Sequence, residues 1–168
     1  MSEETAALAH DYGRLVFNAA YRVLGNVALA EDVQQDVFLK LIEARSSKVE
    51  SWPAYLVASA VRGAIDQLRR QKRWGRLKRF WGAHEIDTAA SAEQFGIACE
   101  RGLRLRLALT RLSRREAQCF SLRYLESLDI SEIAQALTLS ENNVNVTLHR
   151  ARRRLEAQLD DSAEEITR

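Results

Sequence analysis

Few residues in this sequence have the types and spacing that catalysis or metal binding requires. The chain has three histidines, and none is spaced as a metal ligand or as a member of a Ser-His-Asp triad; they are His10, His84 and His149. Asp32 and Asp36 would share one face of a helix as a carboxylate pair, but no positioned partner accompanies them. We therefore predict no catalytic residue, no metal site, no cofactor and no small-molecule substrate, and we disfavour an enzyme.

The two cysteines, Cys99 and Cys119, show no CxxC spacing. Free thiols in a reducing cytosol are the favoured interpretation, with a disulfide or a metal site as the alternative. No apolar run approaches the roughly 20 residues that span a bilayer. The acidic start also lacks the basic and then apolar pattern of a secretory signal. We expect a cytoplasmic protein without membrane insertion.

The chemistry that the sequence does favour is contact with a polyanion. The net charge is only +2, but the charges are segregated along the chain. Residues 62–79 hold eight bases and one acid, residues 101–115 hold six arginines and no acid, and residues 150–154 hold four arginines. Residues 82–100 have the opposite sign, with four acids and no Lys or Arg. Three separate basic clusters favour nucleic-acid binding over solvated helix faces.

Helices must position these side chains, because helical periodicity dominates the sequence. Apolar residues recur at helical spacing up to Val23, and Gly25-Asn26 supplies a stop. A second helix is predicted over 28–44. Pro53 is placed to open a third, since its missing N–H costs nothing in the first turn. Hydrophobic residues make up 46% of the chain and it has a single proline, so we predict an all-α fold.

The second half is predicted to contain four helices, the first over 102–112. Two capping boxes, Ser113 with Glu116 and Asp129 with Glu132, start the next two helices, and Ser140 caps a fourth that runs to about residue 159. A short helix and then a long one, joined by a few residues, outline a helix-turn-helix.

Two small helical domains follow from this pattern. Periodicity weakens after the third helix, where residues 87–92 are small and polar. We predict a first domain over 1–73, a flexible linker over 74–99, a second domain over 100–160 and an acidic tail over 161–168.

Two sets of motifs resemble the extracytoplasmic-function (ECF) sigma factors and together cover most of the chain. The first half resembles the sigma-2 domain of that family at 21–26 (YRVLGN), 30–40 (AEDVQQDVFLK) and 66–70 (DQLRR). The second half resembles the sigma-4 domain at 112–116, 122–124 and 148–153 (LHRARR). Two independent motif sets in the family's order argue against coincidence.

The resemblance implies a sigma factor, which binds core RNA polymerase, recognises the −35 and −10 promoter elements and nucleates DNA melting. It implies a polymerase-docking face on the second helix, comprising Asp32, Gln35, Asp36, Phe38, Leu39 and Ile42. It implies −10 contacts from the third helix and the loop before it, comprising Trp52, Tyr55, Arg62, Arg69, Arg70 and Arg73. It implies −35 contacts from the last helix, comprising Ser140, Asn142, Asn143, Asn145, His149, Arg150 and Arg153. An anti-sigma factor is also implied as a partner.

Two matters stay open among these residues. Trp52 and Tyr55 are either stacking platforms for bases or part of the core. The recognition helix has Asn143-Val144-Asn145 where the family usually shows Thr-Val-Lys or Thr-Val-Arg, and the preceding turn has Thr138 where glycine is frequent. These departures bear on the −35 sequence rather than on the docking mode.

The alternative interpretation is a stand-alone helix-turn-helix regulator that binds duplex operators. It accounts for residues 113–155. It leaves the AEDVQQDVF run and the basic third helix unexplained.

Overall fold

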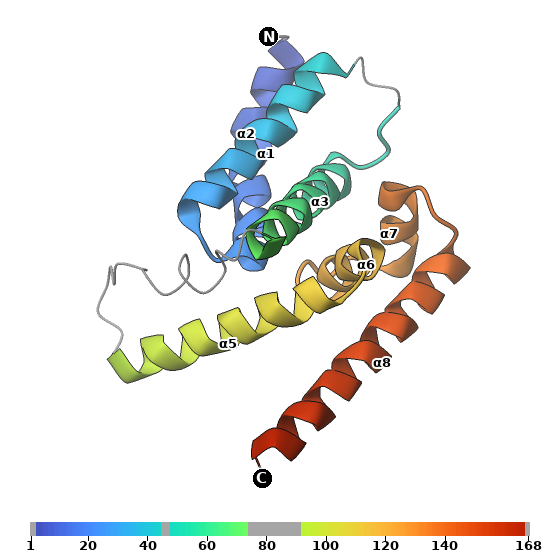
Figure 1. Cartoon of the computed structure of the whole chain (residues 1–168). Coiled ribbons are helices and arrows are strands. Elements are labelled where there is room, and N and C mark those ends of the chain that lie inside the picture. Colours follow the sequence, from blue (N-terminus) through green and yellow to red (C-terminus); the bar gives the residue numbers. More distant parts are fainter. Residues whose placement is uncertain (1–2, 45–47, 74–91, 167–168) are drawn as a thin grey trace.

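The computed structural model describes residues 3–44, 48–73 and 92–166, which form helices joined by short connections (Figure 1). The helices are α1 (Glu3–Leu24), α2 (Val27–Glu43), α3 (Trp52–Arg73), α5 (Ala92–Arg111), α6 (Arg114–Tyr124), α7 (Ile130–Leu137) and α8 (Glu141–Ile166). The predicted all-α class is confirmed. Within the described residues, no helix is both long and apolar enough to cross a membrane.

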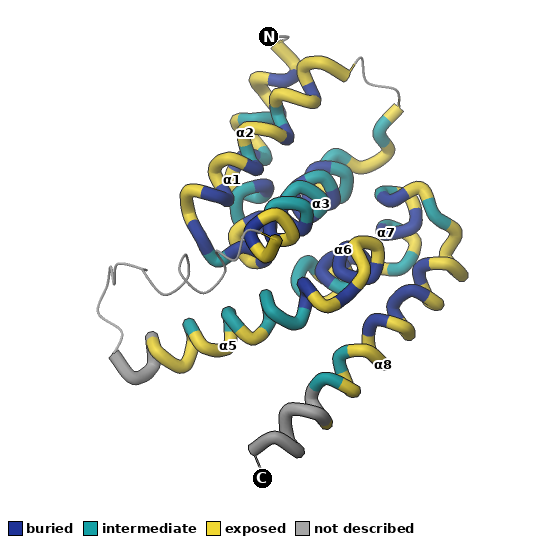
Figure 2. The backbone as a smooth tube through the Cα atoms, viewed as in Figure 1, coloured by how far each residue is buried: buried dark blue, intermediate teal, exposed yellow. Residues whose placement is uncertain are grey.

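The N-terminal unit is a bundle of α1, α2 and α3, in which each helix contacts the other two. Buried positions recur along all three helices (Figure 2). Val16, Val23 and Leu56 are among the fully buried residues. Asn26 starts α2 by accepting a hydrogen bond from the Leu29 N–H at 2.9 Å, which satisfies one of the free donors at the helix start. These contacts fix the direction in which α2 and α3 present their outer faces.

Gly25 makes the tight turn between α1 and α2. Its φ of +59° lies in the left-handed region that glycine adopts without strain, and its N–H donates to the Tyr21 carbonyl at 2.7 Å. A Cβ at this position would collide with the guanidinium of Arg106, which reaches the turn from α5. The stop predicted at Gly25-Asn26 therefore also serves as a contact between the two halves of the chain.

The C-terminal unit is built on the two predicted capping boxes, and both are confirmed. In each, the N-cap oxygen accepts from the N–H three residues on, and the glutamate accepts from the N-cap N–H; the pairs are Ser113 with Glu116 and Asp129 with Glu132. Helix α8 packs across α6 and α7, with Val144 and Leu148 buried. A short helix followed by a long one confirms the helix-turn-helix outline.

Two helix boundaries differ from the predictions. Helix α5 begins at Ala92 rather than at 102, so residues 92–99, which the sequence analysis placed in the linker, are helical. Its first turn contains Ala, Glu and Gln, which are good helix formers. Helix α8 continues to Ile166, because residues 160–166 contain no glycine or proline to end it. Residues 74–91 of the predicted linker lie outside the described residues.

Thr138 occupies a strained position in the turn between α7 and α8. It ends α7 in the left-handed conformation, with φ 57° and ψ 50°, where a β-branched side chain is unfavourable. We expect Thr138→Gly to stabilise the chain by about 1 kcal/mol, since relief of this strain exceeds the entropy that glycine adds to the unfolded state. Urea unfolding measures the change.

The matched control is Ala136→Gly, two positions earlier and inside α7. Here glycine is expected to destabilise by about 1 kcal/mol, because the backbone is already helical. Destabilisation of both variants to the same extent would contradict the strain at Thr138.

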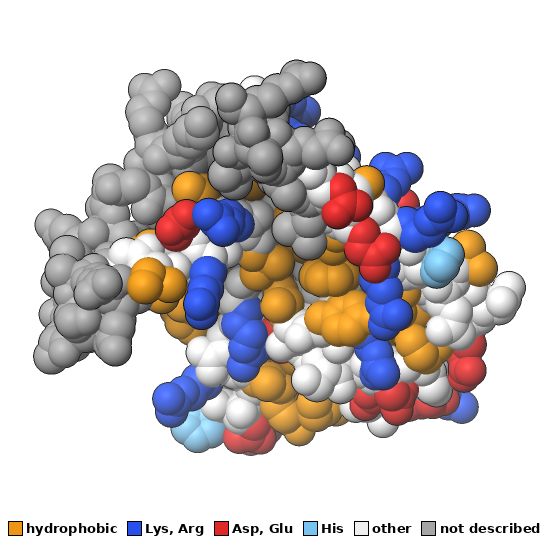
Figure 3. Space-filling view, turned by 90° about the horizontal axis from the view of Figure 1, so that it is seen from below, with side chains coloured by type: hydrophobic (Ala, Val, Ile, Leu, Met, Phe, Trp, Pro, Cys, Tyr) orange, Lys and Arg blue, Asp and Glu red, His pale blue; other side chains and the backbone are white. Residues whose placement is uncertain are grey.

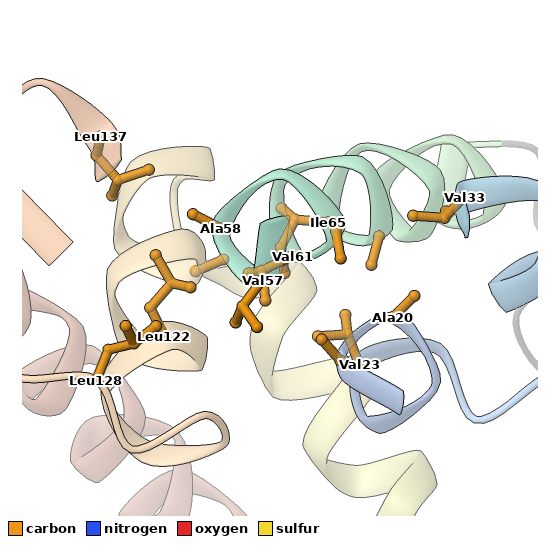
Figure 4. Packing of buried hydrophobic residues seen from close by; sticks show 14 of the residues in the cluster. Ala20, Val23, Val33, Val57, Ala58, Val61, Ile65, Leu122, Leu128 and Leu137 are labelled. Carbon is orange, nitrogen blue, oxygen red and sulfur yellow. The ribbon is translucent and has the colours of Figure 1, made fainter. Parts of the chain in front are cut away.

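The two units share α3 as a common wall. Their buried residues form one hydrophobic cluster, and α3 contacts α6 and α7 as well as α1 and α2. Ala58 of α3 lies on the side that faces Leu122 of α6, whereas Ala20 and Val23 of α1 lie on the opposite side (Figure 4). Because α3 is buried on two sides, the halves of the chain are in direct contact.

Both cysteines are free thiols, which contradicts the disulfide alternative. Cys119 is fully buried in the cluster, and burial raises the pKa of its thiol to about 11. It therefore stays protonated and unreactive at neutral pH.

Candidate polymerase and nucleic-acid interfaces

Helix α2 presents an outer face that mixes carboxylates with large apolar side chains. Asp32 and Asp36 are exposed on it together with Gln35. Leu39 is 56% exposed and Ile42 is 42% exposed, although both are large hydrophobic residues. Apolar anchors among polar groups are typical of a protein-binding surface.

Phe38 differs from the residues grouped with it. Its side chain is half-buried and packs against the hydrophobic core. Phe38 therefore lies partly on the inner side of α2, whereas Leu39, one position on, is exposed. The exposed apolar part of the α2 face is therefore Leu39 with Ile42.

A groove of about 580 Å³ runs between α2 and α3 and is lined by residues of two predicted sets. The α2 side contributes Asp32, Gln35 and Asp36, and the α3 side contributes Arg62 and Arg70. Candidate polymerase and −10 contacts thus meet at one surface. Arg114 of α6 also lines this groove, through an ion pair of 2.7 Å with Asp66 of α3.

Trp52 and Tyr55 lie together at the start of α3. Their rings meet edge to face, with centroids 5.9 Å apart and an interplanar angle of 88°. Both side chains are half-buried and pack against the hydrophobic cluster. Each side chain thus contributes to the core and keeps part of its surface accessible.

The candidate arginines of α3 have different surroundings. Arg70 and Arg73 are exposed, and Arg62 is half-buried. Arg69 donates a hydrogen bond to the Leu112 carbonyl at 3.3 Å, across the two units. Lys72, which is not among the predicted contacts, donates to the Thr110 carbonyl at 3.1 Å. Lys72 could have been predicted as a further contact, because it follows Arg69 by three residues in the basic run and so lies on the same face of the helix.

The first turns of α8 expose a row of amide side chains. The Ser140 hydroxyl accepts from the Asn143 N–H at 3.1 Å, which confirms the predicted cap. Asn142, Asn143 and Asn145 are exposed, while Val144 between them is buried. The exposed side of these turns therefore carries hydrogen-bonding groups together with one apolar side chain, Val146, which is 40% exposed.

Further along α8 the basic side chains divide into two kinds. Arg152 lies over the Tyr124 ring, 5.3 Å from its centroid, and donates to its hydroxyl. Arg154 forms an ion pair of 3.5 Å with the buried Glu116. Arg150 and Arg153 are exposed, as is His149. In Figure 3, which looks at the side of α5 and α8, Lys and Arg side chains alternate with hydrophobic ones.

Together these features define a helical protein with a helix-turn-helix, a basic third helix and an outer α2 face that mixes carboxylates with exposed apolar side chains. Two family models match this chain. The family described as sigma-70 region 2 matches residues 8–73, and the family described as sigma-70, region 4 matches residues 102–155.

Curated relatives agree with both matches. The chain is 26% identical over 151 residues to the ECF RNA polymerase sigma factor SigK of Mycobacterium ulcerans, covering 88% of this chain and 81% of the relative. It is 26% identical over 166 residues to SigK of Mycobacterium bovis BCG, covering 95% of this chain and 89% of the relative. A probable ECF sigma factor of Mycobacterium tuberculosis, SigI, is also 26% identical over 141 residues, covering 81% of this chain and 49% of the relative.

A solved structure shares the fold. The crystal structure of the Mycobacterium tuberculosis ECF sigma factor SigJ superimposes with a TM-score of 0.51 at 19% identity, over 88% of this chain and 52% of that one. The chain spans about half the length of SigJ. The chain belongs to the ECF sigma factors of the sigma-70 family, which act in transcription initiation.

Proposed function

We propose that this sigma factor docks on core RNA polymerase through the outer face of α2 and reads promoters through α3 and α8. The observation that supports this most is the α2 face, where Leu39 and Ile42 are exposed among carboxylates. A stand-alone operator-binding regulator leaves the AEDVQQDVF run on this face unexplained. We assign the polymerase and −10 contacts to the domain over 1–73 and the −35 contacts to the domain over 100–160.

Strand opening at the −10 element requires no active site. A surface that binds single-stranded DNA better than duplex is sufficient, and aromatic rings with nearby cations supply that preference. Tyr55 with Arg62 and Arg70 forms such a surface along the groove. RNA synthesis itself belongs to the core enzyme, so this subunit has no catalytic role and acts in the cytoplasm, where polymerase and promoters are.

The test of this function is run-off transcription with purified core polymerase on a library of genomic fragments. We expect transcripts from a subset of fragments only when this chain is added. Co-purification with core polymerase distinguishes it from an operator-binding regulator. Binding to duplex fragments without polymerase association or transcripts would favour the regulator.

Arginines of α8 that contact phosphates can be distinguished from arginines that contact other residues of this chain. Arg153 is exposed, so Arg153→Ala is expected to weaken binding to every promoter alike and to reduce the slope of log affinity against log salt by about one. Arg152→Ala is the matched control, since Arg152 contacts Tyr124. Titration of promoter fragments at several salt concentrations measures both. An equal change of slope in the two variants would contradict this division.

An anti-sigma factor is the partner that we propose for regulation. The α2 face is exposed in the described structure, and its apolar residues would bind unwanted partners when polymerase is absent. A protein that covers this face would prevent polymerase binding directly. Pull-down of the tagged chain from cells with and without Leu39→Glu identifies a partner that uses this face.

A further inference from the structure

The buried and exposed residues of α8 form two stripes on opposite sides of the helix (Figure 2). The buried stripe packs on α6 and α7 and recurs at helical spacing, with Val144, Leu148 and Ala151 all buried. A shift of two residues along an α-helix turns the side chain by about 200°, so the stripe opposite the core lies two positions away. The members of this outer stripe are Asn142, Val146, His149 and Arg153, and all four are exposed.

Val146 lies in the middle of the outer stripe and is its only apolar member. Its side chain is 40% exposed. The neighbouring Thr147 differs, because it is buried and donates its hydroxyl to the Asn143 carbonyl at 2.7 Å. Thr147 is therefore held against its own helix, and Val146 is the apolar side chain that the first two turns of α8 present outward.

A single exposed valine is ordinary on a protein surface, but the groups around Val146 favour a ligand. Arg150 and Arg153 are exposed one and two turns further on, and Asn142 and Asn145 are exposed before it. Cations of this kind bind phosphates, whereas amides near the start of a recognition helix reach base edges. The face of α8 that approaches DNA therefore carries Val146 toward the bases.

The major groove offers an apolar group at one base, the 5-methyl group of thymine. Contact between this methyl and a valine removes apolar surface of both from water, which favours binding. Cytosine carries a hydrogen at the same carbon, so it offers no methyl for a valine to contact. A cytosine that is methylated at this carbon presents the methyl again.

We infer that Val146 reads the 5-methyl group of a pyrimidine in the −35 element, so that α8 binds thymine or 5-methylcytosine at that position better than cytosine. This inference rests on the proposed function of α8. It adds a specificity that the amides do not supply, since an amide reads hydrogen-bonding groups and not a methyl. Methylation of a cytosine at that position would raise the occupancy of the promoter.

The experiment uses holoenzyme, assembled from the full chain and core polymerase, and a promoter fragment whose −35 element has been selected from a randomised library. Each thymine of the element is replaced in turn by uracil, which keeps the base pair and removes only the methyl. We expect one replacement to lower the affinity of wild type about fourfold, the effect of one buried methyl group. The ratio should not change with salt concentration, because a methyl carries no charge.

Val146→Ser removes both γ-methyl groups and should bind the thymine and uracil fragments within about 1.5-fold of each other. The matched control is Val27→Ser, at a valine that is 48% exposed in the first turn of α2, and it should keep the fourfold difference. With cytosine at the sensitive position, methylation at C5 should raise the affinity of wild type about fourfold and leave that of Val146→Ser unchanged.

Both substituted valines are exposed, so we expect both variants to fold, and circular dichroism checks their helicity. The comparison of thymine with uracil in wild type needs no variant. A selected element without thymine, equal affinity of wild type for every thymine and uracil fragment, or the same loss in Val146→Ser would overturn the inference. If wild type selected no −35 sequence at all, the proposed function itself would be contradicted, so the two failures are distinguishable.

Discussion

Replacing Asp36 with arginine is expected to weaken binding of core RNA polymerase by about 100-fold or more while the chain stays folded. Asp36 is exposed in the middle of the α2 face, beside Leu39. Reversing a charge within a desolvated interface leaves two like charges facing each other, which costs several kcal/mol. Equilibrium binding of the labelled chain to purified core polymerase, with helicity as the folding check, measures the effect.

The matched control is Asp11→Arg, which makes the same charge change at an exposed position of α1. It should leave the affinity within about twofold, as expected for a surface charge outside an interface. Leu39→Ala with Ile42→Ala is the apolar counterpart and should also weaken binding strongly. Phe38 is excluded from this test, because its side chain packs on the core and its removal would destabilise α2. If folded Asp36→Arg bound core polymerase with wild-type affinity, α2 would not be the docking face.

Replacing Asn145 with arginine is expected to change the −35 sequence that the protein selects. Asn145 is exposed in the second turn of α8, the part of a recognition helix that reaches base edges in the major groove. An amide pairs bidentately with adenine, whereas arginine pairs with guanine, and each good pair discriminates by about 1–3 kcal/mol. We therefore expect wild type to favour adenine at one position, and Asn145→Arg to favour guanine there by about tenfold.

Selection from a library with a randomised −35 element measures this preference. Arg150→Ala is the control, since a phosphate contact should change affinity but not the selected sequence. Asn143 is a weaker candidate, because it lies where the Ser140 cap closes the first turn. If Asn145→Arg leaves the sequence unchanged while Arg150→Ala alters it, the roles of the two residues are reversed.

Local features of the fold could be predicted from sequence because they depend on neighbouring residues. The capping boxes at Ser113 and Asp129 are formed within four residues and appear as predicted. The start of α5 was missed because residues 87–92 are small and polar and the periodicity around them is weak, while the helix formers Ala92, Glu93 and Gln94 were sufficient to start the helix.

The candidate site was only partly predictable, for two physical reasons. Phe38 and Leu39 are adjacent, and only the rotation of α2 in its bundle decides that one is half-buried and the other exposed. The contact of Arg69 with the Leu112 carbonyl joins residues far apart in the sequence, so no local pattern indicates it. The basic run marked Arg69 as a cation but not its partner.

The shared wall formed by α3 couples the folding of the two halves. Its Val57 and Val61 are buried with the N-terminal helices, and its Ala58 is buried against α6, all within one hydrophobic cluster. Loss of either unit would expose apolar surface of α3 to water, a cost that the remaining unit would carry. Residues of both halves therefore belong to one cooperative unit, and loss of α6 and α7 should lower the protection of α3 amide hydrogens against exchange by destabilising the helix that holds them.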